Sequence, residues 1–462
     1  MKITFLGGTG TVTGSKYLVE TATTKLLIDC GLYQGYKWLR KRNREPLPLN
    51  INELDGIVLT HAHLDHSGFI PAIYKQGYRG LVYTHGATLG LCSILLPDSG
   101  HIQEDDAKFY SKHKLSKHET PEPLYDKQTA RDSLSIFETV DFEEETVVGD
   151  ITFYLQPAGH ILGAASIILK ANGKTIGFSG DVGRTNDLLM PPPKALPKLD
   201  LLLLESTYGN REHSTDDPYD QVADIINKTV KKGGVTLIPS FAVGRTEVIQ
   251  HILAILIEQK RIPKIPIFLD SPMAINVFDF YCQYNELIKL SKENCHKMCN
   301  VASFVRTVDE SKSLSEVAMP HIIIAGSGMV TGGRILHHLK RLVGNSRTTV
   351  LFTGYQSGGT RGGKMLSGVD TIKIHGKWLP VKADVEVVHG LSGHGDFKEL
   401  TQWLLSSPLS KNTPIQLVHG DPEASETFRD YLSQHTGFDV SIASYKSIIK
   451  VEQLYFKQAD KQ

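Results

Sequence analysis

Short apolar runs that end at a polar residue recur along the chain. Four of these runs lead to a side chain that can bind a metal ion: residues 56–60 to His61, residues 152–155 towards His160, residues 175–178 towards Asp181, and residues 201–204 to Glu205. Apolar runs of this length are typical of buried strands. Side chains that follow the carboxyl ends of neighbouring strands gather at one edge of an α/β sheet. The pattern therefore predicts an α/β protein with a site at its strand ends.

The pattern changes to strand–turn–helix units in the middle of the chain. Apolar runs followed by a turn and a helical stretch occur at residues 235–239, 265–269, 321–325 and 350–353. Repeated units of this kind favour a parallel sheet with helices on its faces. The stretch from residue 385 returns to the style of the first third. We therefore expect a first domain formed by residues 1–209 and 385–462, with an inserted domain at residues 210–384.

Length, charge and cysteine content narrow the class of protein. A chain of 462 residues is too long for one ordinary core. Lys and Arg number 50 and Asp and Glu number 50, so affinity for nucleic acid must come from a local surface. Five cysteines without a disulfide framework indicate a reducing compartment. With no targeting segment and no apolar run long enough for a bilayer, we expect a cytoplasmic protein without a membrane partner.

One cysteine pair needs a separate interpretation. Cys295 and Cys299 have the spacing of half a zinc site, but no second pair accompanies them. We interpret them as free thiols on a surface helix or loop.

Residues 61–66 carry the strongest chemical signal. Three imidazoles and a carboxylate fall within this segment: His61, His63, Asp65 and His66. One zinc ion takes about four nitrogen or oxygen ligands. We expect His61 and His63 to converge on one metal ion and Asp65 and His66 to face a second, about 3.5–4 Å away, which suits a phosphoryl centre. A solvated histidine-rich loop is the alternative, and the glycine-flanked His160 and Asp181 argue against it.

The ordered motifs resemble a known family. The chain resembles the four sequence motifs of the metallo-β-lactamase superfamily at Asp29, residues 61–66, His160 and Asp181. The additional motifs of its β-CASP branch, which acts on nucleic acids, are similar to residues 205–209, residues 392–396 and residues 418–420. The resemblance covers nearly the whole chain and extends to the nuclease subunit of the pre-mRNA 3′-end cleavage factor and its bacterial and archaeal RNA-processing relatives. It implies an αββα sandwich with an inserted β-CASP domain, a parallel sheet flanked by helices.

The resemblance also implies the roles of individual residues and a cofactor of two Zn²⁺ per chain. The implied metal ligands are His61, His63 and His160 for the first zinc, Asp65, His66 and His419 for the second, and Asp181 between the two. Asp29 would support the site by hydrogen bonds. Asp65, Glu205 and His394 would be catalytic, the last two by protonating the leaving group.

These roles predict a ribonuclease. A metal-activated hydroxide would hydrolyse single-stranded RNA and leave a 5′ phosphate and a 3′ hydroxyl, with internal and 5′-terminal cutting both open. His419 favours RNA because DNA-directed members of the branch resemble one another in having an apolar residue there. The alternatives are a DNA phosphodiesterase of the same branch, a small-molecule metallo-hydrolase, and an RNA-binding subunit with a vestigial site. A homodimer is left open.

Two further segments could contact RNA. Residues at strand-to-helix turns of the insert could bind phosphate through backbone N–H groups or guanidinium groups: Ser240, Arg245, Ser327, Gly328, Arg334 and Gly354. The alternative is that these are tight turns with solvated arginines. Residues 38–44 form a dense basic cluster near Tyr33 and Tyr36, which would suit single-stranded RNA. We prefer a solvated amphipathic segment whose aromatic side chains, including Trp38, lie in the core.

Overall fold

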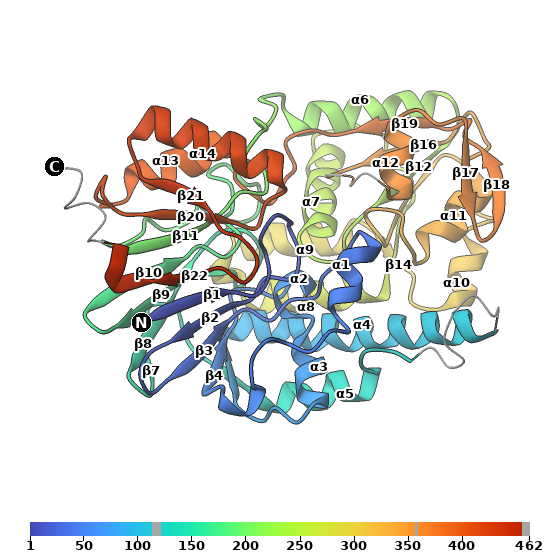
Figure 1. The fold of residues 1–462 in the computed structure, drawn as a ribbon. Helices are drawn as coiled ribbons and strands as arrows, with labels where there is room; N and C mark the ends of the chain where they lie inside the picture. The colour runs from blue at the N-terminus through green and yellow to red at the C-terminus, as the bar shows by residue number, and fades with distance from the viewer. Residues whose placement is uncertain (113–121, 355, 357–358, 455–462) are drawn as a thin grey trace. The chain divides into compact units, whose positions relative to one another are not determined.

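The structure is a computed structural model that describes residues 1–112, 122–354, 356 and 359–454. The chain divides into two compact units (Figure 1). The sandwich unit comprises Met1–Asn186, Pro192–Glu212 and His394–Gln462. The insert unit comprises Asp187–Pro191 and His213–Gly393.

Two sheets form the centre of the sandwich unit, each with seven strands among the described residues. The first sheet has the order β22 (Ile448–Lys450), β1 (Lys2–Phe5), β2 (Tyr17–Glu20), β3 (Lys25–Ile28), β4 (Gly56–Val58), β5 (Leu81–Thr84) and β6 (Phe137–Thr139). The second sheet has the order β21 (Val440–Ile442), β20 (Ile415–Val418), β11 (Leu201–Glu205), β10 (Lys174–Phe178), β9 (Ala165–Ala171), β8 (Ile151–Pro157) and β7 (Thr146–Val148). In both sheets an antiparallel half is joined to a parallel half.

A continuous apolar core lies between these two sheets. The first sheet contributes Phe5 and Leu26, and the second contributes Phe153, Ile167 and Phe178, all of them almost inaccessible to water. The alternating burial along β1 and β8 shows why: one face of each strand meets the other sheet. Burial of this apolar area is the main stabilising term of the unit.

Helices cover the outer faces of the sandwich. The helical segments of the unit are α1 (Lys37–Arg42), η1 (Ile51–Glu53), α2 (Leu64–Ser67), α3 (Ile70–Lys75), α4 (Gly86–Lys112), α5 (Lys127–Asp132), η2 (Ser133–Ile136), α13 (Phe397–Ser406), α14 (Pro422–Thr436) and η4 (Val451–Leu454). Trp403 of α13 and Phe428 of α14 pack against Leu204 and Leu417 of the second sheet. On the other side, α3, α4 and α5 run along the first sheet (Figure 1). The predicted αββα sandwich is confirmed.

The insert unit is built on a parallel sheet, as the strand–turn–helix pattern predicts. Its strand order is β14 (Ser303–Phe304), β13 (Ile267–Asp270), β15 (His321–Ala325), β12 (Val235–Pro239), β16 (Thr349–Phe352) and β19 (Asp384–Val387). The helical segments are α6 (Pro218–Lys231), α7 (Arg245–Glu258), α8 (Pro272–Gln283), η3 (Asn285–Leu287), α9 (Lys292–Asn300), α10 (Val308–Ser313), α11 (Ile335–Leu342) and α12 (Arg361–Leu366). A hairpin of β17 (Thr371–Ile374) and β18 (Lys377–Pro380) completes the unit.

The point of return to the sandwich unit differs from the expected one. The expected boundary puts residue 385 in the first domain, whereas β19 (Asp384–Val387) pairs in parallel with β16 of the insert sheet. The compact insert unit continues to Gly393. A strand of only four residues carries no local sign of which sheet it joins, because pairing depends on contacts with the neighbouring strand.

Two short helices, α2 and α3, are separated by a break just after the histidine-rich segment. Helix α2 ends at Ser67 with Gly68 as its cap, and α3 begins at Ile70 with Pro71 in its first turn. Proline is tolerated there because the first helical N–H groups have no partner within the helix. The break turns the chain immediately after His66.

The basic segment also differs from the preferred interpretation. Tyr33 is buried, but Tyr36 and Trp38 are 58% and 56% exposed, so the expectation of a buried aromatic side is wrong for these two. The guanidinium of Arg42 lies 4.3 Å from the ring centroid of Tyr445 and 5.1 Å from that of Trp38. The short helix α1 therefore presents aromatic and cationic groups side by side.

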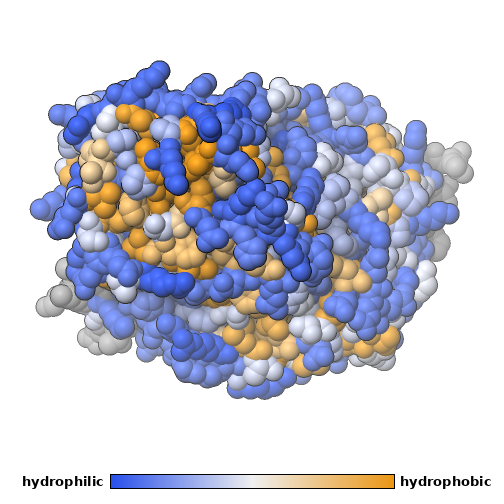
Figure 2. Space-filling view, turned by 180° about the vertical axis from the view of Figure 1, so that it is seen from behind, coloured by the Kyte–Doolittle hydropathy of each residue, from blue (hydrophilic) through white to orange (hydrophobic). Residues whose placement is uncertain are grey.

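The surface is largely polar on the face shown in Figure 2. Hydrophilic residues cover much of this face, and hydrophobic residues gather in patches between them. No helix among the described residues combines the length and the apolar character needed to cross a bilayer.

A buried glutamate makes the stability of the insert unit depend on pH. Burial raises the pKa of Glu247, in the first turn of α7, from 4.5 to about 8. The folded chain therefore keeps a proton that the unfolded chain releases near pH 4.5, and the free energy of unfolding falls as pH rises from 4.5 to about 8. This interval corresponds to at most about 5 kcal/mol. Glu247→Gln is expected to remove the fall, measured by urea unfolding at pH 5 and pH 8.

The control is Glu258→Gln at the exposed end of the same helix. This variant should keep the pH dependence of the wild type. The prediction would be contradicted if the free energy of unfolding fell by the same amount from pH 5 to pH 8 in Glu247→Gln as in the wild type.

Candidate metal centre

The predicted site residues of the sandwich unit follow the carboxyl ends of its strands. Five of them follow or end parallel strands: Asp29 after β3, His61 after β4, Asp181 after β10, Glu205 at the end of β11, and His419 after β20. Parallel strands end at the same edge of a sheet, so the fold itself brings these side chains together.

One group of ligand atoms comes from His61, His63, His160 and Asp181, which all lie within 4.8 Å of one another. Nδ1 of His63 lies 3.2 Å from Nε2 of His61 and 3.2 Å from Nε2 of His160. Oδ2 of Asp181 lies 3.3 Å from Nε2 of His61 and 3.5 Å from Nε2 of His160. Three imidazoles and one carboxylate are the number and kind of ligands that one zinc ion takes.

A second group comes from Asp65, His66 and His419, again within 4.8 Å of one another. Nε2 of His66 lies 3.2 Å from Nε2 of His419, and the latter atom lies 3.4 Å from Oδ2 of Asp65. His66 and His419 are separated by more than 350 positions in the sequence and meet only because the sandwich closes around both.

Asp181 faces both groups. While Oδ2 points to the first, Oδ1 lies 3.3 Å from Nε2 of His66 and 3.4 Å from Nδ1 of His419. Oδ1 is buried and makes no hydrogen bond among the described residues. A buried carboxylate oxygen without a hydrogen bond is costly unless a cation offsets its charge.

The spacing of the donor atoms fits a metal ion. Zinc–nitrogen bonds of about 2.0–2.1 Å place neighbouring ligand atoms of a tetrahedron about 3.3 Å apart. The separations in the first group are 3.2–3.5 Å. The residues present therefore form a site for divalent metal ions.

Burial keeps the imidazoles of the first group neutral. Burial, and then the neighbouring His61, lowers the pKa of His63 to about 3. Burial also lowers the pKa of His61, and burial with the nearby His394 holds the pKa of His160 well below its usual range. A neutral imidazole has a free lone pair, which is the form that binds a metal ion.

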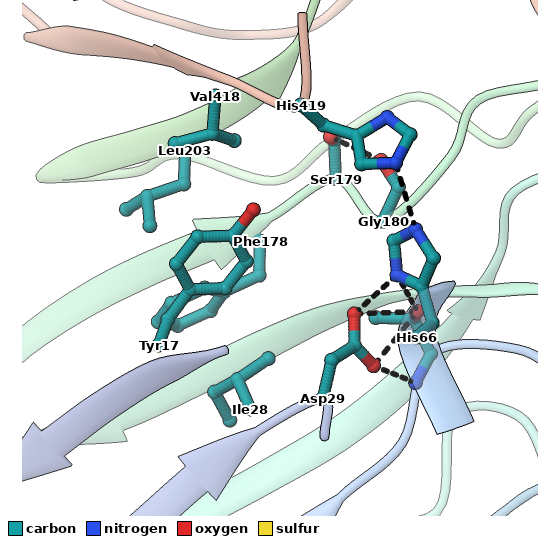
Figure 3. Close-up of a pocket in the computed structure, with 11 residues that line it drawn as sticks. Tyr17, Ile28, Asp29, His66, Phe178, Ser179, Gly180, Leu203, Val418 and His419 are labelled. Carbon is teal, nitrogen blue, oxygen red and sulfur yellow. Dashed lines mark hydrogen bonds and ion pairs between the residues drawn. The ribbon is translucent and has the colours of Figure 1, made fainter. Parts of the chain in front are cut away.

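Asp29 orients the ring of His66 (Figure 3). Nδ1 of His66 lies 2.6 Å from Oδ2 of Asp29, so this nitrogen donates its hydrogen and Nε2 is turned towards His419. Burial opposes a charge on His66, but Asp181 and Asp29 outweigh it and raise its pKa well above the usual value. Asp29 is itself held by the backbone N–H of Thr60 at 2.8 Å. Such a carboxylate–histidine pair fixes which ring nitrogen faces a metal ion.

Two site residues adopt an unusual backbone conformation. Asp29 has φ of 58° and His419 has φ of 50°, both in the left-handed region. Non-glycine residues pay about 1–3 kcal/mol for such strain, which clusters at functional sites. The conformation turns both side chains into the same pocket at the strand ends (Figure 3).

Glu205 and His394 form a separate pair beside Asp181. Nδ1 of His394 lies 3.1 Å from each carboxylate oxygen of Glu205, and the backbone N–H of Val182 donates to Glu205 Oε1 at 2.6 Å. Nε2 of His394 lies 3.9 Å from Oδ2 of Asp181. Burial opposes protonation of His394, but the carboxylates of Glu205 and Asp181 raise its pKa to about 9. These two carboxylates therefore favour the cationic, doubly protonated form of the His394 imidazole.

Sequence reasoning missed two threonines that support the site. Thr60 Oγ1 lies 3.0 Å from Asp29 Oδ1 and 3.0 Å from Nδ1 of His61. Thr207 Oγ1 lies 3.0 Å from Nδ1 of His419. A threonine at a strand end has no distinctive chemistry, so the only sequence signal was adjacency to a motif.

Comparison with known proteins identifies the family. The family model described as the metallo-beta-lactamase superfamily matches residues 9–219, the Beta-Casp domain matches residues 246–365, and the Zn-dependent metallo-hydrolase RNA specificity domain matches residues 378–443. Ribonuclease TTHA0252 of Thermus thermophilus is 33% identical over 456 residues, which cover 96% of this chain and 99% of that one. The chain belongs to the β-CASP branch of the metallo-β-lactamase superfamily. It is a hydrolytic enzyme.

Other members of the β-CASP branch are also similar over most of their length. The transcription termination factor FttA of Methanocaldococcus jannaschii is 30% identical over 455 residues, which cover 93% of this chain and 68% of that one. An RNase J-like protein of the same organism is 29% identical and covers 92% of this chain and 93% of its own length. A crystal structure of a protein of unknown function from Enterococcus faecalis shares the fold, with a TM-score of 0.53 and 14% identity over 97% of this chain and 99% of that chain.

The residues predicted to contact phosphate in the β-CASP domain lie at one edge of its sheet. Ser240 follows β12, Ser327 and Gly328 follow β15, Gly354 follows β16, and Arg245 begins α7. Strands β15, β12 and β16 are parallel neighbours, so their carboxyl ends lie together. A sheet edge of this kind is where α/β folds bind ligands.

Arg334 differs from the rest of this set because its charge is used within the β-CASP domain. Its guanidinium pairs with the fully buried carboxylate of Asp270. It also donates to the carbonyl oxygens of Val305 at 3.1 Å and Arg306 at 2.8 Å. A phosphate would have to compete with these partners.

Proposed function

We propose that the chain is a zinc-dependent ribonuclease that hydrolyses single-stranded RNA with two Zn²⁺ per chain. His61, His63 and His160 would hold one ion, Asp65, His66 and His419 the other, and Asp181 would bridge. The observation that carries the proposal is that one oxygen of Asp181 faces each group at 3.3–3.5 Å. A carboxylate between two metal ions is a feature of sites that hydrolyse phosphodiesters.

The chain's own residues account for positioning and for proton transfer. Zinc ions bound here would supply the Lewis acidity that ionises water near neutral pH and offsets charge on the phosphoryl group. Asp29 fixes the ring of His66 through Nδ1. His394, protonated and held by Glu205, delivers a proton to the departing 3′ oxygen. The P–O3′ bond breaks, so the products carry a 5′ phosphate and a 3′ hydroxyl.

Three observations support RNA as the substrate. His419 lies in the second group, 3.2 Å from His66. The RNA specificity domain matches residues 378–443, and one relative of nearly the same length is named a ribonuclease. Backbone phosphates would be bound at the sheet edge that carries Ser240, Ser327 and Gly354. The five cysteines are free thiols, which supports a cytoplasmic location.

The direct test is incubation with 5′-labelled and 3′-labelled single-stranded RNA and with DNA of the same sequence. We expect RNA to be cut, with 5′-phosphate and 3′-hydroxyl ends. Mononucleotides released from one end would indicate an exonuclease, and discrete fragments an endonuclease. His63→Ala should lower the rate at least about a hundredfold, since it loses several kcal/mol of charge stabilisation.

The matched control is His101→Ala on the exposed part of α4, which should cut RNA at the wild-type rate. Full activity of His63→Ala would refute the assigned centre. Preferential cutting of DNA would replace the ribonuclease by a DNA phosphodiesterase.

A further inference from the structure

Three cysteine thiols meet in the insert unit, away from the histidine and aspartate groups in the sequence. Cys282 lies in the last turn of α8, and Cys295 and Cys299 lie on α9. The sulfur of Cys282 is 3.2 Å from that of Cys295 and 3.4 Å from that of Cys299. All three sulfur atoms lie within 4.8 Å of one another. We call these residues the thiol cluster.

The local fold explains why the cluster forms. Residues four apart lie on the same face of a helix, so Cys295 and Cys299 present their thiols together. After α8 the chain turns through η3 (Asn285–Leu287), and Ser291 caps α9 by accepting the backbone N–H of Asn294. This helical hairpin returns α9 to the end of α8. Cys282 is the missing partner of the pair seen in the sequence, separated from Cys295 by 13 positions.

The geometry suits a metal ion better than a disulfide. Zinc–sulfur bonds of about 2.3 Å place the sulfur atoms of a tetrahedral site about 3.8 Å apart. The distances of 3.2 and 3.4 Å differ from this by a few tenths of an ångström. A disulfide needs sulfur atoms about 2.05 Å apart and uses two thiols, which leaves the third unexplained. Cys295 is buried, while Cys282 and Cys299 are partly exposed, so solvent reaches the cluster.

We propose that the thiol cluster is a further metal site, which binds one thiophilic divalent cation of the zinc class through three thiolates. A thiol that binds the cation releases its proton to solvent as the sulfur–metal bond forms. The fourth position is left for water or an added ligand. Because the three ligands come from both arms of the α8–α9 hairpin, the bound cation ties the two helices together and stabilises the insert unit.

The test uses Co²⁺ as the probe on the full chain, stripped of metal and kept reduced. Thiolate ligands produce an intense sulfur-to-cobalt charge-transfer absorption, which histidine and carboxylate ligands do not. Once every site is filled, we expect this absorption to have the intensity of one cobalt–thiolate site per chain, and we expect Zn²⁺ to displace it. Cys282→Ser and Cys295→Ser should weaken it at least about tenfold.

Two controls separate this site from the proposed catalytic centre. Cys92→Ala removes a buried thiol outside the cluster, and His63→Ala removes a residue of the catalytic centre. Both should keep the absorption, so loss of RNA cleavage and loss of the thiol site are distinguishable. Thermal unfolding of each variant identifies any that fail to fold. The single variant Cys299→Ser is added as a further test of the cluster.

Zn²⁺ should raise the Tm of the wild type more than that of Cys299→Ser. Absence of the sulfur-to-cobalt absorption in the reduced wild type would overturn the proposal. So would an absorption that persists unchanged in folded Cys282→Ser and Cys295→Ser. If the reduced protein bound no cobalt at the cluster and two of its cysteines formed a disulfide on oxidation, the cluster would be a redox pair and not a metal site.

Discussion

RNA cleavage by Asp181→Asn is expected to fall at least about a thousandfold below the wild-type rate. The carboxylate lies within 3.5 Å of histidines of both groups, so its loss weakens both halves of the centre. An amide keeps the shape but removes the negative charge that would offset two cations. A loss of about 4 kcal/mol in stabilisation of the transition state corresponds to this factor. Single-turnover cleavage of labelled RNA at saturating enzyme measures it.

The matched substitution is Asp200→Asn, in the same unit, where the carboxylate pairs with Lys174 at 3.1 Å. It makes the same chemical change outside the metal centre and should leave the rate within about twofold of the wild type. Zinc analysis of both variants should show metal lost from Asp181→Asn alone. A rate for Asp181→Asn near that of Asp200→Asn would show that the carboxylate is not part of the centre.

His394→Ala is expected to lower the RNA cleavage rate by about 10²–10⁴ while leaving the metal content unchanged. The imidazole lies beside the two groups and is held by Glu205, and the role proposed for it is to donate a proton to the leaving group. A substrate whose leaving group needs no proton, such as bis(p-nitrophenyl) phosphate, should therefore be cleaved by the variant at nearly the wild-type rate. Equal losses on both substrates would contradict a proton-donor role.

The same pair predicts a shift in pH dependence. The carboxylate of Glu205 favours the protonated form of His394, so Glu205→Gln should lower the pKa of His394. The midpoint of the fall in cleavage rate at alkaline pH would then move to a lower pH by about 1–3 pH units. Glu212→Gln, an exposed glutamate of the same unit, should keep the wild-type profile. If the fall in rate at alkaline pH occurred at the same pH in Glu205→Gln as in the wild type, the Glu205 carboxylate would not control the pKa of the group that titrates.

The strand–turn–helix pattern of the insert and the first candidate ligands follow from local signals, whereas the αββα sandwich and the full set of candidate ligands were implied by the family resemblance. The spacing of the histidines and the aspartate in residues 61–66 alone predicts metal ligands. The apolar runs before His160 and Asp181 predict strands that end near these residues. Parallel strands then bring these residues to one edge, as the structure shows for β10 and β11. The αββα architecture and the family were predicted through the ordered motifs, and both are confirmed.

Features that depend on contacts between segments far apart in the sequence could not be predicted from local patterns. The thiol of Cys282 joins Cys295 only through the turn between α8 and α9. Strand β19 (Asp384–Val387) belongs to the insert sheet because β16 is its partner. The exposure of Trp38 depends on what packs against α1, which the basic pattern does not specify. Each depends on contacts between segments that carry no shared motif.

The most direct test is anomalous diffraction at the zinc absorption edge from crystals of the zinc-loaded enzyme. We predict two peaks about 3.5–4 Å apart with Asp181 between them. One peak should be bonded to His160 and the other to His419, each with its neighbours from residues 61–66. A single peak at this centre, or a pair that leaves His160 or His419 unbonded, would contradict a two-metal phosphodiesterase.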